Sequence, residues 1–264
     1  MGASLRRTWW PEELLSCFTK SSAPCVGPGP RARSDTVEPV STRVKICGLT
    51  NLADAEAAAQ LGAWALGMIF HEASPRACSV EEAVQICATL RRRAETCGVF
   101  VNASLDDVVA AAEEIGLTML QFHGDEGPSY CLEAGRRTGA KVIRARQVSG
   151  PGDVREIERF HVDFHLLDAR SERRPGLRGG TGETFDWELL AARRSRVPLI
   201  LSGGIDAANA AAAIAAVHPF ALDSASGTES APGHKDHASM AALFAAVRAA
   251  DAEHAPPSGI GQPA

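Results

Sequence analysis

The chain has 264 residues, of which 45% are hydrophobic and 22% charged, and its formal net charge is −5. This composition is ordinary for a globular protein, and the acidic balance argues against a nucleic-acid partner, which would need a basic face. The 7 cysteines form no Cys-x-x-Cys pair, so we expect neither a metal site nor a disulfide framework, and a reducing cytoplasm fits best. No apolar run approaches the ~20 residues that a membrane helix needs, so we expect no membrane partner.

The two ends of the chain differ in composition from the middle. Proline, glycine, serine and arginine dominate residues 21–41, and proline and glycine recur after residue 255. Such segments cannot bury enough apolar surface to become ordered. We therefore predict a disordered extension over residues 1–42, one domain over residues 43–250, and a disordered tail over residues 251–264.

Within the domain, a short apolar run, a loop and an alanine-rich amphipathic run alternate through eight units. Apolar strands that alternate with helices predict a parallel sheet covered by helices, and eight units suit a single-domain α/β fold of the (β/α)8 TIM-barrel type. A doubly wound open sheet is the alternative, although it usually carries its phosphate loop after the first strand. The predicted strands are residues 43–47, 63–70, 96–102, 118–122, 141–146, 164–168, 197–202 and 220–223. The predicted helices are residues 52–61, 80–92, 105–115, 128–138, 152–159, 187–192, 207–216 and 236–249.

Two residues with acid–base chemistry end predicted strands. Cys47 closes the first strand just before a helix that Thr50 or Asn51 can cap, and Asp168 closes the sixth strand. In a closed barrel these strand ends meet on the catalytic face. Position alone leaves two alternatives open, because most such thiols are buried packing residues and a carboxylate at a strand end can be a helix cap.

Small residues follow the seventh and eighth predicted strands. Gly203 and Gly204 come after the seventh, and Asp223, Ser226 and Gly227 stand at or after the end of the eighth. Glycine-rich loops expose backbone N–H groups, and barrels often bind phosphate between these two loops. We predict a phosphate site here, with simple tight turns as the alternative.

Three further features could contribute to the same face. Arg76, after the second strand, suits bidentate capture of a carboxylate or phosphate, although a single loop arginine is usually solvated. His123, after the fourth strand, could be a base, a ligand donor or, most commonly, a satisfied polar residue. Residues 169–184 form a long glycine-rich loop, which could be a lid or a disordered insertion.

At this point the ordered motifs indicate a family. Lys45-Ile46-Cys47-Gly48-Leu49-Thr50 resembles the opening signature of phosphoribosylanthranilate isomerase, a tryptophan-biosynthesis enzyme. The resemblance covers residues 43–248 and implies a (β/α)8 barrel. It also implies an Amadori rearrangement of N-(5-phosphoribosyl)anthranilate to 1-(2-carboxyphenylamino)-1-deoxy-D-ribulose 5-phosphate, without metal or organic cofactor. Further matches follow over residues 67–70, 74–76, 98–102, 120–124, 166–168, 180–187, 201–205, 223–229 and 232–236.

By resemblance, Cys47 is the general base and Asp168 the general acid, while Arg76 holds the anthranilate carboxylate. The loops after strands seven and eight would hold the phosphate, and His123 and Asp223 would help to bind the substrate. Alternation along the first strand places Lys45 on the same face as Cys47, where its charge could favour the thiolate.

One departure touches the phosphate loop, because Ala225 stands where the family usually has a serine. We expect weaker phosphate binding from this change. We also expect a monomer or a homodimer. A non-catalytic phosphate-binding barrel and another phosphosugar isomerase or epimerase remain alternatives.

Overall fold

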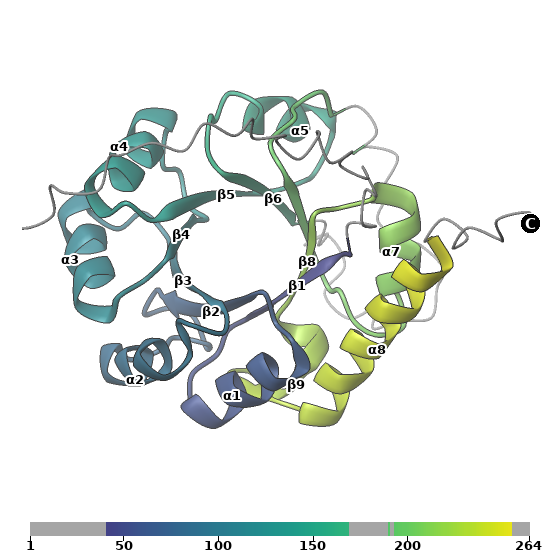
Figure 1. Ribbon diagram of the computed structural model, residues 1–264. Coiled ribbons are helices and arrows are strands. Elements are labelled where there is room, and N and C mark those ends of the chain that lie inside the picture. The colour runs from purple at the N-terminus through teal and green to yellow at the C-terminus, as the bar shows by residue number, and fades with distance from the viewer. Residues whose placement is uncertain (1–40, 169–189, 191–192, 255–264) are drawn as a thin grey trace, which may run out of the picture. The chain divides into compact units, whose positions relative to one another are not determined.

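The structure, a computed structural model, describes residues 41–168, 190 and 193–254. Within these residues eight parallel strands close into a barrel in the order β1 to β8, and the helices lie outside it (Figure 1). Closure is made where β1 pairs with β8, with Lys45 opposite Asp223. The predicted (β/α)8 barrel is thereby confirmed, and the open-sheet alternative is wrong.

Most predicted elements lie within a few residues of their observed positions. The bounds of β1, β6, α1, α3 and α4 agree at both ends, and α8 runs to His254, past the predicted domain boundary at residue 250. The predicted extension up to residue 40, the loop at 169–184 and, apart from Leu190, the helix at 187–192 lie outside the described residues. The strands are β1 Arg43–Cys47, β2 Ala65–Phe70, β3 Glu95–Phe100, β4 Met119–Phe122, β5 Lys141–Gln147, β6 Phe164–Asp168, β7 Leu199–Ser202 and β8 Ala221–Ser224. The helices are α1 Leu52–Leu61, α2 Val80–Leu90, α3 Leu105–Ile115, α4 Pro128–Thr138, α5 Pro151–Ile157, α7 Ala210–Val217 and α8 His237–His254.

Local side-chain chemistry sets several helix ends. Asn51, Ser79 and Ser104 each accept a hydrogen bond from a backbone N–H in the first turn of α1, α2 and α3. Gly62 and Gly116 end α1 and α3 in the left-handed conformation that lets a chain turn out of a helix. These signals are encoded within a few residues, which explains why the sequence predicted these bounds well.

Two apolar cores lie on opposite faces of the sheet. The outer core packs the helices against the strands, and the inner core fills the barrel with residues such as Met119, Ile143 and Leu166. Trp64, Phe164 and Phe220 pack edge-on or tilted, with ring centroids 5.1–5.2 Å apart. Because these three residues stand at the beginnings of β2, β6 and β8, they close the N-terminal end of the barrel and leave the C-terminal end for polar residues.

A small hairpin, not predicted from the sequence, follows β8. It consists of a 3₁₀ turn, η1 Ser226–Thr228, and two antiparallel strands, β9 Glu229–Ala231 and β10 His234–Lys235. The Thr50 hydroxyl donates to the Gly233 carbonyl at 2.6 Å, and Asp54 accepts from the Lys235 backbone N–H at 2.9 Å. The hairpin is therefore fastened to the loop and helix that follow β1.

None of the helices in the described part of the chain combines the length and apolar character needed to span a membrane.

Candidate active site

Cys47 and Lys45 share one small space inside the barrel. Both face inward from β1; the Cys47 residue is 5% exposed and Lys45 is fully buried. A Cβ atom added at Gly67 of β2 would lie 2.9 Å from Cys47 Sγ and 3.2 Å from Lys45 Nζ. The glycine thus leaves the room that the thiol and the ammonium occupy. The predicted shared face of Lys45 and Cys47 is confirmed.

A buried ion pair between Lys45 and Asp223 lies next to this thiol. Lys45 Nζ donates to Asp223 Oδ1 at 2.8 Å, and the Ser202 hydroxyl donates to Asp223 Oδ2 at 3.2 Å. Burial alone would lower the pKa of Lys45, but the attraction of Asp223 and of the nearby thiols outweighs it and raises that pKa. Lys45 is therefore protonated at neutral pH. Asp223, predicted to bind substrate, has both oxygens engaged within the protein and holds Lys45 in place.

The charge state of Cys47 follows from the same surroundings. Burial raises the pKa of the Cys47 thiol, the Lys45 charge opposes this rise, and the Asp223 charge adds to it. The net shift is upward, so at neutral pH the thiol holds its proton before any ligand binds. A cation that arrives next to Sγ would favour the thiolate.

Asp168 ends β6 on the same rim. Its strand neighbours Phe164 and Leu166 belong to the inner core, so alternation directs Asp168 toward the barrel mouth. It pairs with Ser202 in the register of β6 and β7, and its carbonyl accepts a hydrogen bond from Val148 N at 2.9 Å. Ser202, whose hydroxyl donates to Asp223, is therefore the neighbour of Asp168 in the sheet.

His123, the first residue after β4, faces the same mouth. The surrounding protein desolvates the ring and lowers the pKa of His123, while the carboxylates of Asp168 and Asp223 oppose the shift. The side chain is nevertheless exposed to solvent on its open side. A neutral imidazole near both carboxylates can donate one hydrogen bond and accept another.

Arg144, which the sequence did not single out, holds the backbone on both sides of His123. Its guanidinium donates to the carbonyls of Phe122 and Gly124 at 2.9 and 2.8 Å, and it pairs with Glu126 at 3.1 Å. Both charged side chains are nearly inaccessible to solvent. This buried pair therefore fixes the turn from which His123 projects.

Arg76 lies next to Gly48, the residue that follows Cys47. Its Cδ packs over Gly48, where an added Cβ would approach it to 2.8 Å. The Arg76 guanidinium forms an ion pair with Glu229 of the hairpin at 2.7 Å. Lys235 Nζ also donates to Glu229 at 3.1 Å and to the Ala225 carbonyl at 2.9 Å. The predicted carboxylate-binding arginine therefore reaches the rim as part of a cluster with Glu229 and Lys235.

The two small-residue loops meet beside this cluster. The Ser224 hydroxyl donates to the Ile205 carbonyl at 2.7 Å, and a Cβ added at Gly227 would overlap that same carbonyl. Gly204 and Ser226 lie exposed on these loops. The structure thus brings together the loops of the predicted phosphate site, as barrel closure requires.

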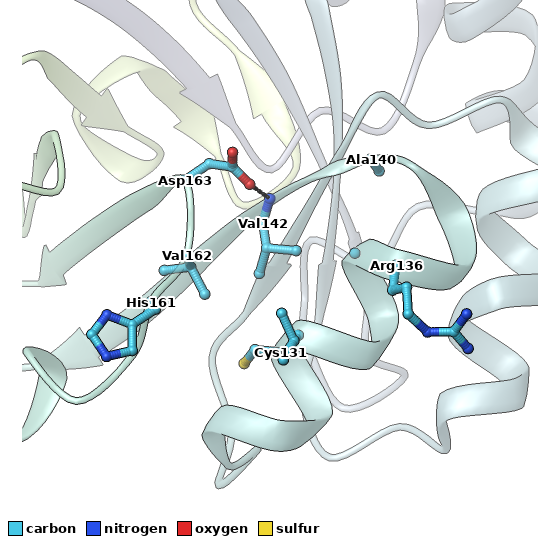
Figure 2. A pocket seen from close by; sticks show the side chains of 9 residues that line it. Cys131, Arg136, Ala140, Val142, His161, Val162 and Asp163 are labelled. Atoms are coloured by element: carbon cyan, nitrogen blue, oxygen red, sulfur yellow. Dashed lines mark hydrogen bonds between the residues drawn. The ribbon is translucent and has the colours of Figure 1, made fainter.

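A separate cavity lies on the outer wall of the barrel, between α4, β5 and the turn before β6 (Figure 2). It has a volume of about 260 Å³, and Asp163 at its edge accepts a hydrogen bond from Val142 N at 2.8 Å. No predicted site residue lines it. Among the described residues, no three His, Cys, Asp or Glu side chains gather in a way that could hold a metal ion.

Comparison with known proteins decides the family. The model of the family described as N-(5'-phosphoribosyl)anthranilate (PRA) isomerase matches residues 44–246. The chain belongs to this isomerase family. Membership of a different family of phosphosugar barrels, which the two small-residue loops alone had left open, is thereby excluded.

Individual relatives agree with the family match. An N-(5'-phosphoribosyl)anthranilate isomerase of Magnetococcus marinus is 41% identical over 211 residues, which are 80% of this chain and 97% of that protein. One of Geobacter sp. is 44% identical over 195 residues, 74% of this chain and 92% of its own length.

Solved structures of the family share the fold. The phosphoribosyl anthranilate isomerase of Thermotoga maritima has a TM-score of 0.69 at 36% identity, covering 79% of this chain and 99% of its own. A second isomerase structure, in complex with reduced 1-(o-carboxyphenylamino)-1-deoxyribulose 5-phosphate, has a TM-score of 0.67 at 34% identity, with the same coverage of both chains.

The sequence did not identify Glu229 and Lys235 as functional residues. Glu229 is 153 positions from Arg76, so no local pattern connects them. The sequence offered one signal for them. Both residues lie in segments that match the family, residues 223–229 and 232–236, but these matches indicated no role for either side chain.

Proposed function

We propose that the chain catalyses the Amadori rearrangement of N-(5-phosphoribosyl)anthranilate in L-tryptophan biosynthesis, with Cys47 as general base and Asp168 as general acid. The observation that carries these roles is the rim arrangement in a chain of this family. The buried Cys47 thiol lies next to the Lys45 ammonium, and the carboxyl group of Asp168, from β6, lies at the same end of the barrel. A base and an acid on one face are what the reaction needs.

The proposed steps balance within the substrate and these two groups. The Asp168 carboxyl group gives its proton to the furanose ring oxygen while the C1–O bond breaks, which leaves an iminium cation between C1 and nitrogen. The Cys47 thiolate takes the proton from C2, and that C–H electron pair moves to form the enolamine. In the tautomerisation to the ketone, the Cys47 thiol gives its proton to C1 and the C2 hydroxyl gives its proton to the Asp168 carboxylate. Hydrogen has then moved from C2 to C1, both groups regain their starting protonation states, and no external oxidant is consumed.

The electrostatics of Cys47 fit this order of events. In the unliganded protein, burial holds the thiol protonated by raising its pKa, although Lys45 partly opposes this. The iminium that forms next to Sγ adds a second positive charge and favours the thiolate. The thiol would therefore give up its proton to water as the positive charge develops, so that the thiolate is present at the stage that requires removal of the C2 proton.

The ends of the substrate have matching groups in this proposal. Arg76 binds the aryl carboxylate, and the loops that carry Gly203, Gly204, Ser226 and Gly227 bind the phosphate. His123 contacts the sugar from the mouth of β4. Ala225 lacks the hydroxyl that a serine would offer, and the Lys235 contact to its carbonyl keeps that loop in place.

Loss of substrate fluorescence with the purified chain tests the proposal. Cys47→Ser and Asp168→Asn should each lower kcat by several orders of magnitude with little change in KM. Cys131→Ser is the matched control, because this buried thiol lies on α4 outside the barrel. Wild-type protein that binds the reduced product analogue without turnover would instead support a non-catalytic barrel.

We further propose that the protein acts in the cytoplasm as a monomer or a homodimer. A relative from Thermotoga maritima is described as a dimeric isomerase of which monomers were generated. Light scattering of the purified chain distinguishes the two states, and a larger assembly would contradict the proposal.

A further inference from the structure

Glu229 makes the most extensive polar contact with Arg76. Arg76 Nε donates to Glu229 Oε1 and Oε2 at 2.8 and 3.0 Å, and Arg76 Nη2 donates to Oε2 at 2.7 Å. The Glu229 side chain is only 4% exposed, whereas that of Arg76 is 21% exposed. The carboxylate is thus buried, and the solvent-exposed part of the pair belongs to the Arg76 side chain.

The contact uses only one edge of the guanidinium. Nε and Nη2 form the side edge, which Glu229 occupies. Nη1 and the second hydrogen of Nη2 form the end edge, and among the described residues no acceptor engages Nη1. A guanidinium has donors for two carboxylates at once, so the pair with Glu229 leaves a bidentate edge for a second one.

The charges of the cluster favour such a second anion. Glu229 also accepts from Lys235 Nζ at 3.1 Å, and the Lys235 side chain is fully buried. One carboxylate therefore faces two cations, and the cluster keeps a net positive charge. Glu229 holds Arg76 without cancelling its attraction for an anion.

The element that carries Glu229 is itself fixed. Its hairpin is bound to Thr50 and Asp54, which follow Cys47 in the chain, and Lys235 binds the Ala225 carbonyl in the eighth loop. Glu229 therefore connects Arg76 to two segments. One is the segment after Cys47, and the other is the loop after β8. A side chain anchored in this way can set the direction of the long, flexible arginine.

We propose that Glu229 is a positioning residue that aims the end edge of Arg76 at the aryl carboxylate of the substrate. The inference rests on the proposed function, because it needs a ligand that carries this carboxylate. It differs from a simple electrostatic competition, in which Glu229 would weaken the binding of any anion to Arg76. The two possibilities predict opposite effects when the Glu229 charge is removed.

The experiment compares two ligands on three variants. The ligands are the reduced product analogue and the same compound without its aryl carboxylate, with Kd measured by calorimetry. Glu229→Gln removes the charge and keeps the shape, and Glu229→Asp keeps the charge on a shorter arm. Glu95→Gln is the control, because it breaks a comparable pair with Lys141, of 2.6 Å, at the opposite end of the barrel.

Glu229→Gln should weaken the carboxylated ligand about tenfold, on the scale of a misdirected charge-assisted pair, and leave the other ligand within about twofold. Glu229→Asp should recover part of the loss, the control should change neither Kd, and KM should rise more than kcat falls. Tighter binding of the carboxylated ligand, or equal weakening of both ligands, would overturn the inference. Absent turnover by the wild-type protein would instead refute the proposed function.

Discussion

Replacing Lys45 with methionine tests how strongly the barrel depends on its buried ion pair. Lys45 Nζ lies 2.8 Å from Asp223 Oδ1, and the two side chains are 0% and 6% exposed. Removing the ammonium leaves the Asp223 carboxylate buried with the Ser202 hydroxyl, at 3.2 Å, as its remaining side-chain donor among the described residues. Loss of one partner from a buried pair lowers the free energy of unfolding by about 3–5 kcal/mol, because the remaining charge stays desolvated.

Unfolding in guanidinium chloride, monitored by tryptophan fluorescence, measures this loss of stability. Trp64 reports on it because it packs in the aromatic group at the closed end of the barrel. Lys141→Met is the matched control. It removes a similar 2.6 Å pair with Glu95, but the Lys141 side chain is 50% exposed, so the expected loss is below about 1 kcal/mol. The double variant Lys45→Met with Asp223→Asn removes both charges and should recover most of the stability.

The same variants separate stability from reactivity. Lys45 favours the Cys47 thiolate, so Lys45→Met should slow alkylation of Cys47, measured by mass spectrometry of its peptide near pH ~8.5, the ordinary thiol pKa. The double variant should stay slow although its stability returns. Equal destabilisation by Lys45→Met and Lys141→Met, or faster alkylation without Lys45, would refute the reasoning.

Three further expectations concern pH and chain length. Because burial raises the pKa of Cys47, kcat/KM should still increase as the pH passes ~8.5, and a plateau below pH ~7 would contradict a thiolate base. Burial alone would raise the pKa of Glu229, but Arg76 and Lys235 outweigh it and lower that pKa. Ionised Glu229 therefore stabilises the fold above the ordinary value of ~4.3, and this stabilisation is lost as the pH falls through the lower folded-state pKa. The difference in Tm between wild type and Glu229→Gln should narrow below pH ~4. A difference that stays constant with pH would argue against stabilisation of the fold by ionised Glu229. Removing residues 1–38 should leave kcat/KM and Tm nearly unchanged, because the family match begins at residue 44, and an inactive truncated protein would refute this.

Local chemistry explains where sequence-based prediction succeeded and where it failed. The bounds of α1 and α3 could be predicted because Asn51 and Ser104 cap them within three residues. The start of α7 was predicted at residue 207 and lies at Ala210. Alanine propensity favoured the earlier start, but Asp206 Oδ1 accepts from Ala208 N at 2.8 Å and from Asn209 N at 3.1 Å, and this turn delays the helix.

The sequence by itself determined which residues stand on the rim, because strand ends and alternation are local properties. It placed Cys47 and Asp168 at the ends of β1 and β6, and Lys45 on the same face as Cys47. Only the tertiary structure decided which charges meet there. Lys45 pairs with Asp223 across 178 positions because β1 and β8 are neighbours in the closed barrel, and Arg76 meets Glu229 through a hairpin too short to carry a strand pattern. Charge partners depend on closure and burial, which bring distant segments together, whereas helices and strands depend on neighbours along the chain.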